Sequence, residues 1–230
     1  MRDRRDETPR AWTPRTDLGR KVAAGEVTSM EQVLKSGAKV LEPEIVDVLL
    51  PDLKDEVLEV SSTQRMTACG RKMQMRAIAV VGNRNGAIAV GVGKGRETRE
   101  AVAEAIRDAK KHVTIIQLGC GSWECGCGTP HSILQEANGK SGTTQITLKP
   151  APRGIGIVAG KVTRKVLELV GVKDAWTFAK GRTRNKLNTS IATIKALETL
   201  GHLKKGKTWQ EPTEEQPAEQ PAAETEAAAQ

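Results

Sequence analysis

The sequence predicts an α+β fold in two small units, because strand patterns and helical patterns follow one another twice along 230 residues. A chain of this length buries enough apolar surface for one large or two small cores. A Gly- and Cys-rich stretch, 119–128, separates the halves and breaks both patterns. We therefore expect an N-terminal extension at 1–40, a first domain at 41–113, a connector at 114–129, a second domain at 130–207 and an acidic tail at 208–230.

The first 26 or so residues are polar and rich in Pro and charge. Such a segment buries too little apolar surface to order alone, so it is either a solvated tail or a basic arm that orders on RNA. A capping-box pair, Thr28 and Glu31, then predicts a short helix that ends before Gly37.

The first domain is expected to run helix, three antiparallel strands, helix. Pro43 suits the first turn of a helix that Pro51 terminates. Asn85-Gly86 is a strong hairpin signal between the second and third strands. The expected strands are 58–67, 73–81 and 87–92, and the closing helix, 97–112, has an apolar stripe at Val102, Ala105, Ile106 and Ala109.

The second domain shows strand signals at 133–134, 144–148 and 174–179. Helical spacing of apolar residues recurs at 160–170 and 188–200. Residues 208–230 are rich in Glu, Pro, Gln and Ala, a composition typical of disorder.

Charge is distributed unevenly and predicts a polyanionic partner. The whole chain carries +8, but six Glu and no Lys or Arg lie in 211–230, so residues 1–210 carry 36 basic and 22 acidic side chains. The four Trp, one Phe and absence of Tyr argue against modules that stack bases on aromatic side chains. No apolar run is long enough to span a membrane, and four Cys do not form a disulfide framework, so we expect a reducing, cytoplasmic location.

Enzymatic motifs are weak, and we expect neither catalysis nor a cofactor. Gly93-Lys94 lacks the spacing and the hydroxyl of a P-loop, and two prolines stand between the nearest strand and the Gly154-x-Gly156 fingerprint. One Cys and one His four residues apart, Cys127 and His131, are weak evidence for a nucleophile–base pair. The cluster Cys120, Cys125, Cys127 and His131 has spacings outside the usual zinc-knuckle pairs, which favours free thiols over structural zinc.

The cations gather at turns and helix starts, with Arg71 and Lys72 expected on the turn between the first two strands and Arg84 on the next turn. The stretch 91–96 alternates Gly with other residues, including Lys94 and Arg96, and leads into a helix N-terminus, so we expect its backbone to approach phosphate closely. The alternative is a Gly-rich connector with solvated Lys. The candidate RNA-binding residues are Arg71, Lys72, Arg84, Lys94, Arg96, Lys149, Arg153, Arg182 and Arg184.

Two long stretches carry a family resemblance. Residues 70–94, with VVGNRNGAIAVGVGK at their end, and 148–160, LKPAPRGIGIVAG, resemble the N- and C-terminal signatures of small-ribosomal-subunit protein S-five. The match extends in order over about 58–200, and the 119–131 insertion with its Cys residues is similar to archaeal members.

The resemblance implies a fold and a place. The first domain is expected to resemble a double-stranded-RNA-binding domain, and the second a small α/β domain with a left-handed crossover. The implied role is a structural constituent of the small ribosomal subunit near the point where messenger RNA enters and near the decoding region. The resemblance implies that the chain contacts small-subunit rRNA, messenger RNA and the neighbouring proteins S-four and S-eight, and that it does not contact a membrane. It also implies that the protein supports subunit assembly and translational accuracy. The alternative is a free double-stranded-RNA-binding protein or RNA chaperone outside the ribosome.

Overall fold

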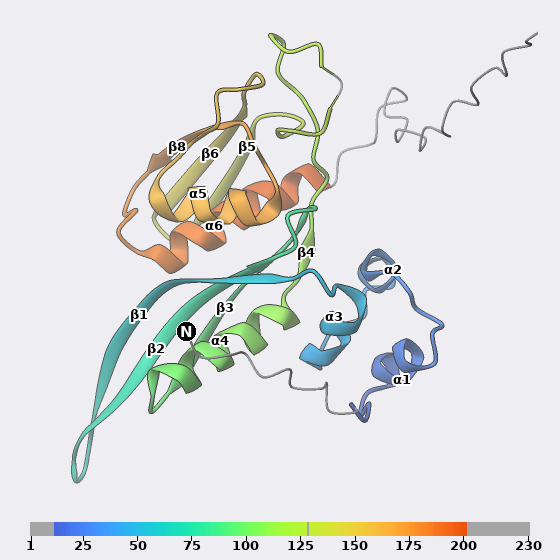
Figure 1. The fold of residues 1–230 in the computed structure, drawn as a ribbon. Helices are drawn as coiled ribbons and strands as arrows, with labels where there is room; N and C mark the ends of the chain where they lie inside the picture. Colours follow the sequence, from blue (N-terminus) through green and yellow to red (C-terminus); the bar gives the residue numbers. More distant parts are fainter. Residues whose placement is uncertain (1–11, 128, 202–230) are drawn as a thin grey trace, which may run out of the picture.

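Two four-stranded sheets organise the computed structural model, which describes residues 12–127 and 129–201. The strand orders are β1-β2-β3-β4 and β5-β6-β8-β7. Helices α5 (Lys161–Val170) and α6 (Lys186–Gly201) lie between the two sheets, and α4 (Thr98–Lys111) covers the outer face of the first sheet (Figure 1). The mixed α and β content predicted from the sequence is confirmed.

Three short helices precede the first sheet: α1 (Asp17–Ala23), α2 (Met30–Lys35) and α3 (Pro43–Leu49). The expectation that this segment has no order of its own up to about residue 26 is wrong for its described part. Helix α1 was not expected, and it buries Val22 in a cluster with Met30, Val33, Ile45 and Val46. The N-cap of α2 is Ser29 rather than Thr28.

The first sheet is built from β1 (Lys54–Thr67), β2 (Gly70–Gly82), β3 (Ala87–Gly95) and a short β4 (Thr114–Ile115). All three neighbouring pairs are antiparallel, and β1 and β2 form a long hairpin that extends away from the helices (Figure 1). In the turn before β3, the side-chain oxygen of Asn83 accepts hydrogen bonds from the N–H groups of Asn85 and Ala87, at 2.8 and 2.9 Å. The predicted hairpin turn at Asn85-Gly86 is thereby confirmed.

The second sheet is built from β5 (Ala137–Ser141), β6 (Thr144–Pro150), β7 (Ile157–Val158) and β8 (Ala175–Lys180). Strand β7 pairs parallel with β8, and α5 connects them. The predicted strand at 133–134 is wrong, since these two residues form no strand and only the preceding residue, Ser132, makes an isolated bridge, to Gly119. Strand β5 was missed because its inward positions, Ala137 and Gly139, carry no large apolar side chain.

The two sheets share one hydrophobic core. Val80 and Ile88 of the first sheet belong to the same buried cluster as Ile146, Leu148 and Leu167 of the second unit. Ion pairs join the units at the edge of this core, Lys165 with Glu56 and Lys186 with Glu59, the latter at 3.1 Å. The second unit therefore has a fixed position on the first sheet.

Two expectations lie outside the described residues, namely the disorder of the acidic tail at 208–230 and the behaviour of the first eleven residues. Among the described helices, none is long and apolar enough to cross a membrane.

Candidate nucleic-acid interface

The end of the β1–β2 hairpin carries the first pair of candidate cations. Arg71 and Lys72 were expected on the turn itself, but the turn residues are Ala68 and Cys69. Gly70 closes the turn with a positive φ of 118°, and the Thr67 hydroxyl donates to its carbonyl oxygen at 2.7 Å. Arg71 and Lys72 are exposed residues of β2 itself, so their side chains leave the hairpin on opposite faces.

Strand register brings four cations onto one face of the first sheet. Lys72 pairs with Arg65 of β1, and Arg76 pairs with Lys94 of β3. Lys72 and Arg76 are four residues apart on β2, and residues separated by an even number point to the same side. We call these four residues, Arg65, Lys72, Arg76 and Lys94, the basic face.

The basic face continues the surface on which the second unit lies. Ile78 and Val80 follow Arg76 on the same side of β2, and Val80 enters the shared core. Arg65 and Arg76 were not among the predicted residues. The alternation of side chains along β2 could have indicated Arg76, because it places Lys72 and Arg76 on the same side of the strand as the apolar residues Ile78 and Val80.

Arg76 has an unusual environment. The residue is half-buried, and its Nε atom is buried without a hydrogen-bond partner among the described residues. A buried guanidinium N–H without an acceptor is costly, and buried polar atoms normally have partners. The atom is therefore a donor without an acceptor at the centre of the basic face.

The glycine-rich stretch before α4 packs against that helix and, contrary to expectation, does not present its backbone to phosphate. A Cβ added to Gly91 or Gly93 would lie 2.2 Å from backbone atoms of α4, at Ala105 and Ala109 or at Ala101 and Ala105. Gly91 and Gly93 thus allow α4 to pack closely against the sheet, and their buried backbone is not accessible to phosphate. The N–H of Arg96 also donates to Glu100, at 3.2 Å, while the side chains of Arg96 and Lys94 remain exposed.

The other candidates do not join a single surface. Arg182 and Arg184 are exposed on the loop before α6, and Lys186 at the start of that helix forms an ion pair with Glu59 of β1. Arg84 lies where the β2–β3 turn meets α5, and its N–H donates to the Leu169 carbonyl at 2.9 Å.

Lys149 and Arg153 lie on the second unit. Lys149 is half-buried, 3.4 Å from Glu136, and its ammonium is 5.5 Å from the Phe178 ring centre, so protein groups already contact it. Arg153 is exposed in the loop after β6. This loop is held by Asp174, which accepts hydrogen bonds from the N–H groups of Gly154 and Gly156.

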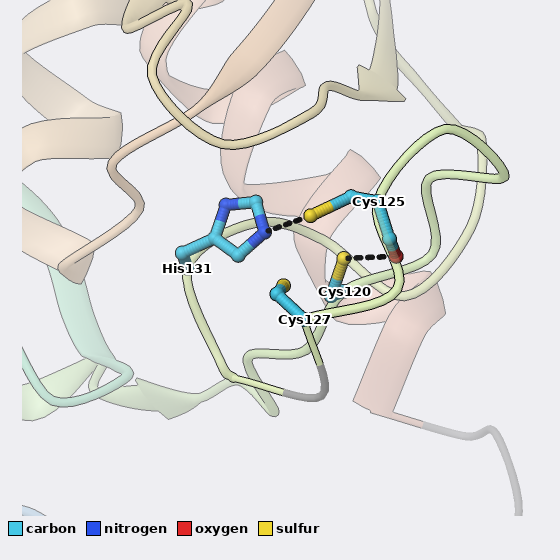
Figure 2. Close-up of side chains that lie close together, drawn as sticks. All are labelled: Cys120, Cys125, Cys127 and His131. Carbon is cyan, nitrogen blue, oxygen red and sulfur yellow. Dashed lines mark hydrogen bonds between the residues drawn. The ribbon is translucent and has the colours of Figure 1, made fainter.

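A second group of candidate ligands meets on the connector. Figure 2 shows the side chains of Cys120, Cys125, Cys127 and His131 converging from two arms of one loop. Burial raises the pKa of the Cys120 thiol to about 11. A hydrogen bond from the Thr129 hydroxyl contributes most to lowering the pKa of Cys127 to about 6.

Family models match both halves of the chain. The model for ribosomal protein S5, N-terminal domain, matches residues 53–117, which span β1 to β4 with α4, and the model for the C-terminal domain matches 139–211. The chain belongs to the ribosomal protein S5 family. The Cys and His cluster lies between the two matched segments of this S5-family chain.

Archaeal proteins are similar to this S5-family chain over most of its length. The small ribosomal subunit protein uS5 of Methanoregula boonei is 51% identical over 197 residues, 86% of this chain and 96% of that protein. The protein of the same name from Methanocaldococcus jannaschii is 50% identical over 189 residues, 82% of this chain and 87% of that protein. The S-five resemblance drawn from the two sequence motifs is therefore confirmed.

Proposed function

We propose that the chain is a structural constituent of the small ribosomal subunit in the cytoplasm, and that it binds small-subunit rRNA through the basic face. Membership of the S5 family is the observation that carries this proposal. The basic face supplies the chemistry, because four cations lie on one side of the first sheet. Lys and Arg contacts to phosphates position a protein on RNA without reading bases.

The position of Arg76 fits an RNA ligand in particular. Arg76 lies at the centre of the basic face, and a guanidinium carries a planar fork of donors that matches phosphate geometry. Lys94, its neighbour across the strands, adds a second positive charge to the same location. Double-stranded RNA is recognised by shape, phosphates and 2′-hydroxyls, which suits a chain with five aromatic residues.

The finer features form part of the same proposal. The order α3-β1-β2-β3-α4 supports a double-stranded-RNA-binding-like first domain, and the α5 connection between parallel β7 and β8 is the crossover that we expect to be left-handed. We retain the division of the chain into its five expected segments. We place the protein near the point where messenger RNA enters and near the decoding region, beside S-four and S-eight, in support of assembly and translational accuracy. The exposed candidates Arg71, Arg84, Arg96, Arg153, Arg182 and Arg184 and the half-buried Lys149 complete the proposed contacts.

The test uses the full chain and a double variant, Lys72→Gln with Lys94→Gln, measured for binding to small-subunit rRNA across a salt series. We expect weaker binding and a slope of log affinity against log salt that is shallower by about 0.9 for each lost duplex phosphate contact. The matched control is Arg107→Gln, an exposed cation of α4 on the other side of the first sheet. Equal effects of control and double variant would contradict the basic face as the interface.

Sedimentation separates the proposal from the free RNA-binding alternative. The full chain should sediment with the small subunit at high salt. Binding to duplex RNA without any association with the subunit would instead support a double-stranded-RNA-binding protein or chaperone outside the ribosome.

A further inference from the structure

The loop 119–131, between the two sheets, holds four potential metal ligands. The Sγ atoms of Cys120, Cys125 and Cys127 and a ring nitrogen of His131 all lie within 4.8 Å of one another. The three cysteines are half-buried free thiols, and His131 is buried. These residues play no part in the basic face.

We propose that Cys120, Cys125, Cys127 and His131 bind one structural zinc ion. Three thiolates and one imidazole form a set that zinc prefers, and four protein ligands close the tetrahedral site to substrate. Each thiol gives up its proton to solvent on binding, so the occupied site carries a net charge of −1.

The observed spacing agrees with a tetrahedral centre. Zinc–sulfur and zinc–nitrogen bonds of about 2.3 and 2.05 Å place neighbouring S and N ligands about 3.6 Å apart at the tetrahedral angle. The Sγ of Cys125 and the Nε2 of His131 are separated by 3.6 Å (Figure 2). These two ligands are already separated as a bound zinc ion requires.

A carboxylate orients the histidine from outside the cluster. Nδ1 of His131 lies 2.8 Å from Oδ2 of Asp174, and both side chains are only 6% exposed. A carboxylate only accepts, so Nδ1 carries the proton, and the neutral ring then presents the Nε2 lone pair to the thiols. Carboxylate–histidine pairs of this kind support zinc ligands in proteins.

Asp174 ties the proposed centre to the rest of the second unit. Its Oδ1 accepts hydrogen bonds from the N–H groups of Gly154 and Gly156, at 3.1 and 2.8 Å. The hydroxyl of Ser132 donates to the Asp174 carbonyl oxygen. One residue thus supports both the histidine ligand and the loop that carries Arg153.

The described residues of the loop 119–131 have few other contacts that hold the loop in place. Trp123, the one aromatic side chain of this loop, is 92% exposed. Backbone hydrogen bonds join the two ends of the loop: the N–H of Gly119 donates to the Ser132 carbonyl at 3.0 Å, and the N–H of Ser132 donates to the Gly119 carbonyl at 2.8 Å. A metal ion bound by four side chains would replace the missing apolar core of this loop. The zinc therefore has a structural role, closing the loop onto the second unit.

The test is metal analysis of the full chain, produced with zinc chloride and purified without chelator. We expect about one zinc ion per chain. The matched control is Cys69→Ser, because Cys69 is the remaining cysteine and lies exposed at the hairpin turn. The control should retain the metal, whereas Cys127→Ser should lose most of it.

Two measurements on unaltered side chains keep the test independent of folding defects in variants. Cobalt chloride added to the metal-free chain should give the visible bands of a tetrahedral thiolate complex. With zinc bound, iodoacetamide should alkylate Cys69 alone, and all four thiols should react after chelation. Absence of zinc together with absence of cobalt bands, or a disulfide among Cys120, Cys125 and Cys127, would overturn the proposal.

Asp174 is expected to act as a positioning residue. Asp174→Asn should weaken zinc binding by about 10- to 100-fold in a competition with a chromophoric chelator while saturating zinc still fills the site. An unchanged zinc affinity would contradict the orienting role of Asp174.

Discussion

Glycines and alanines decide how closely α4 approaches the first sheet. Gly91, Gly93 and Gly95 lie on one side of β3, against the α4 backbone at three alanines spaced four residues apart, Ala101, Ala105 and Ala109. Each missing methyl group makes room for helix backbone. The sequence alone predicted a phosphate-binding loop here, because alternate glycines before a helix are typical of such loops. Only the packing of α4 against β3 shows that these glycines serve helix packing instead.

The substitution Gly93→Ala should destabilise the protein. The added Cβ would lie 2.2 Å from the Ala101 carbonyl oxygen and the Ala105 nitrogen, so strand and helix must separate. Overpacking of this kind costs about 1–3 kcal/mol, which lowers the midpoint of thermal unfolding. Gly160→Ala is the control, since a Cβ there meets no atom within 4 Å and the φ of −62° suits any residue. Equal midpoints for the two variants would contradict this account.

Elements with their own local signals were predictable. Helices α3, α4, α5 and α6 and the β2–β3 hairpin follow from Pro, Asn-Gly and apolar periodicity, with ends that differ by a few residues. Strand β5 and helix α1 were not predictable in this way, because both depend on contacts with residues that are far away in the sequence. Gly139 of β5 lies against the Ala192 carbonyl of α6, and α1 depends on contacts around Glu42.

The ligand cluster illustrates the same limit. The spacing of Cys120, Cys125 and Cys127 along the chain is unlike that of zinc knuckles, yet the fold gathers the three thiols around His131. Asp174, 43 residues further along, completes the arrangement through a contact that sequence spacing does not encode.

Glu42 attaches the start of the described chain to α3. One carboxylate oxygen accepts the N–H groups of Arg15 and Thr16, at 2.9 and 2.6 Å, and the other accepts the Trp12 indole N–H at 2.9 Å. Burial by itself raises the pKa of Glu42, but the hydrogen bonds from Thr16, Arg15 and Trp12 outweigh it, so the pKa lies below the ordinary value of 4.5.

This attachment should be lost in acid. A carboxyl group whose pKa is lowered by docking stabilises the docked segment above its free pKa of 4.5, and that stability disappears as the pH falls through the lower, docked value. The nuclear magnetic resonance signal of the Trp12 indole N–H, assigned with Trp12→Phe, should shift with a midpoint below pH 4.5. In Glu42→Gln the signal should lie at its acid position already at pH 7. A midpoint at or above the ordinary value would contradict the role of Glu42.

The two sheets share one buried core. The helices α5 and α6 lie between the sheets, and the buried cluster runs from Val80 and Ile88 through Leu167 to Ile146. The family models nevertheless describe two domains, matched at 53–117 and 139–211. The shared core means that a binding surface on the first sheet depends on the packing of the second unit.

A cavity in α5 should therefore loosen the first sheet as well as the second. Leu167 is fully buried in the shared cluster, and Leu167→Ala should lower the free energy of unfolding by about 2–5 kcal/mol. Hydrogen exchange followed by mass spectrometry should then show faster exchange in peptides of β2 and β3 together with those of β6 and β8. The control is Ile155→Ala, because Ile155 is an apolar residue of the same unit that is 42% exposed and lies outside the buried cluster. Faster exchange confined to β6 and β8 would show that the first sheet is stable without the second unit, and the basic face would then not depend on it.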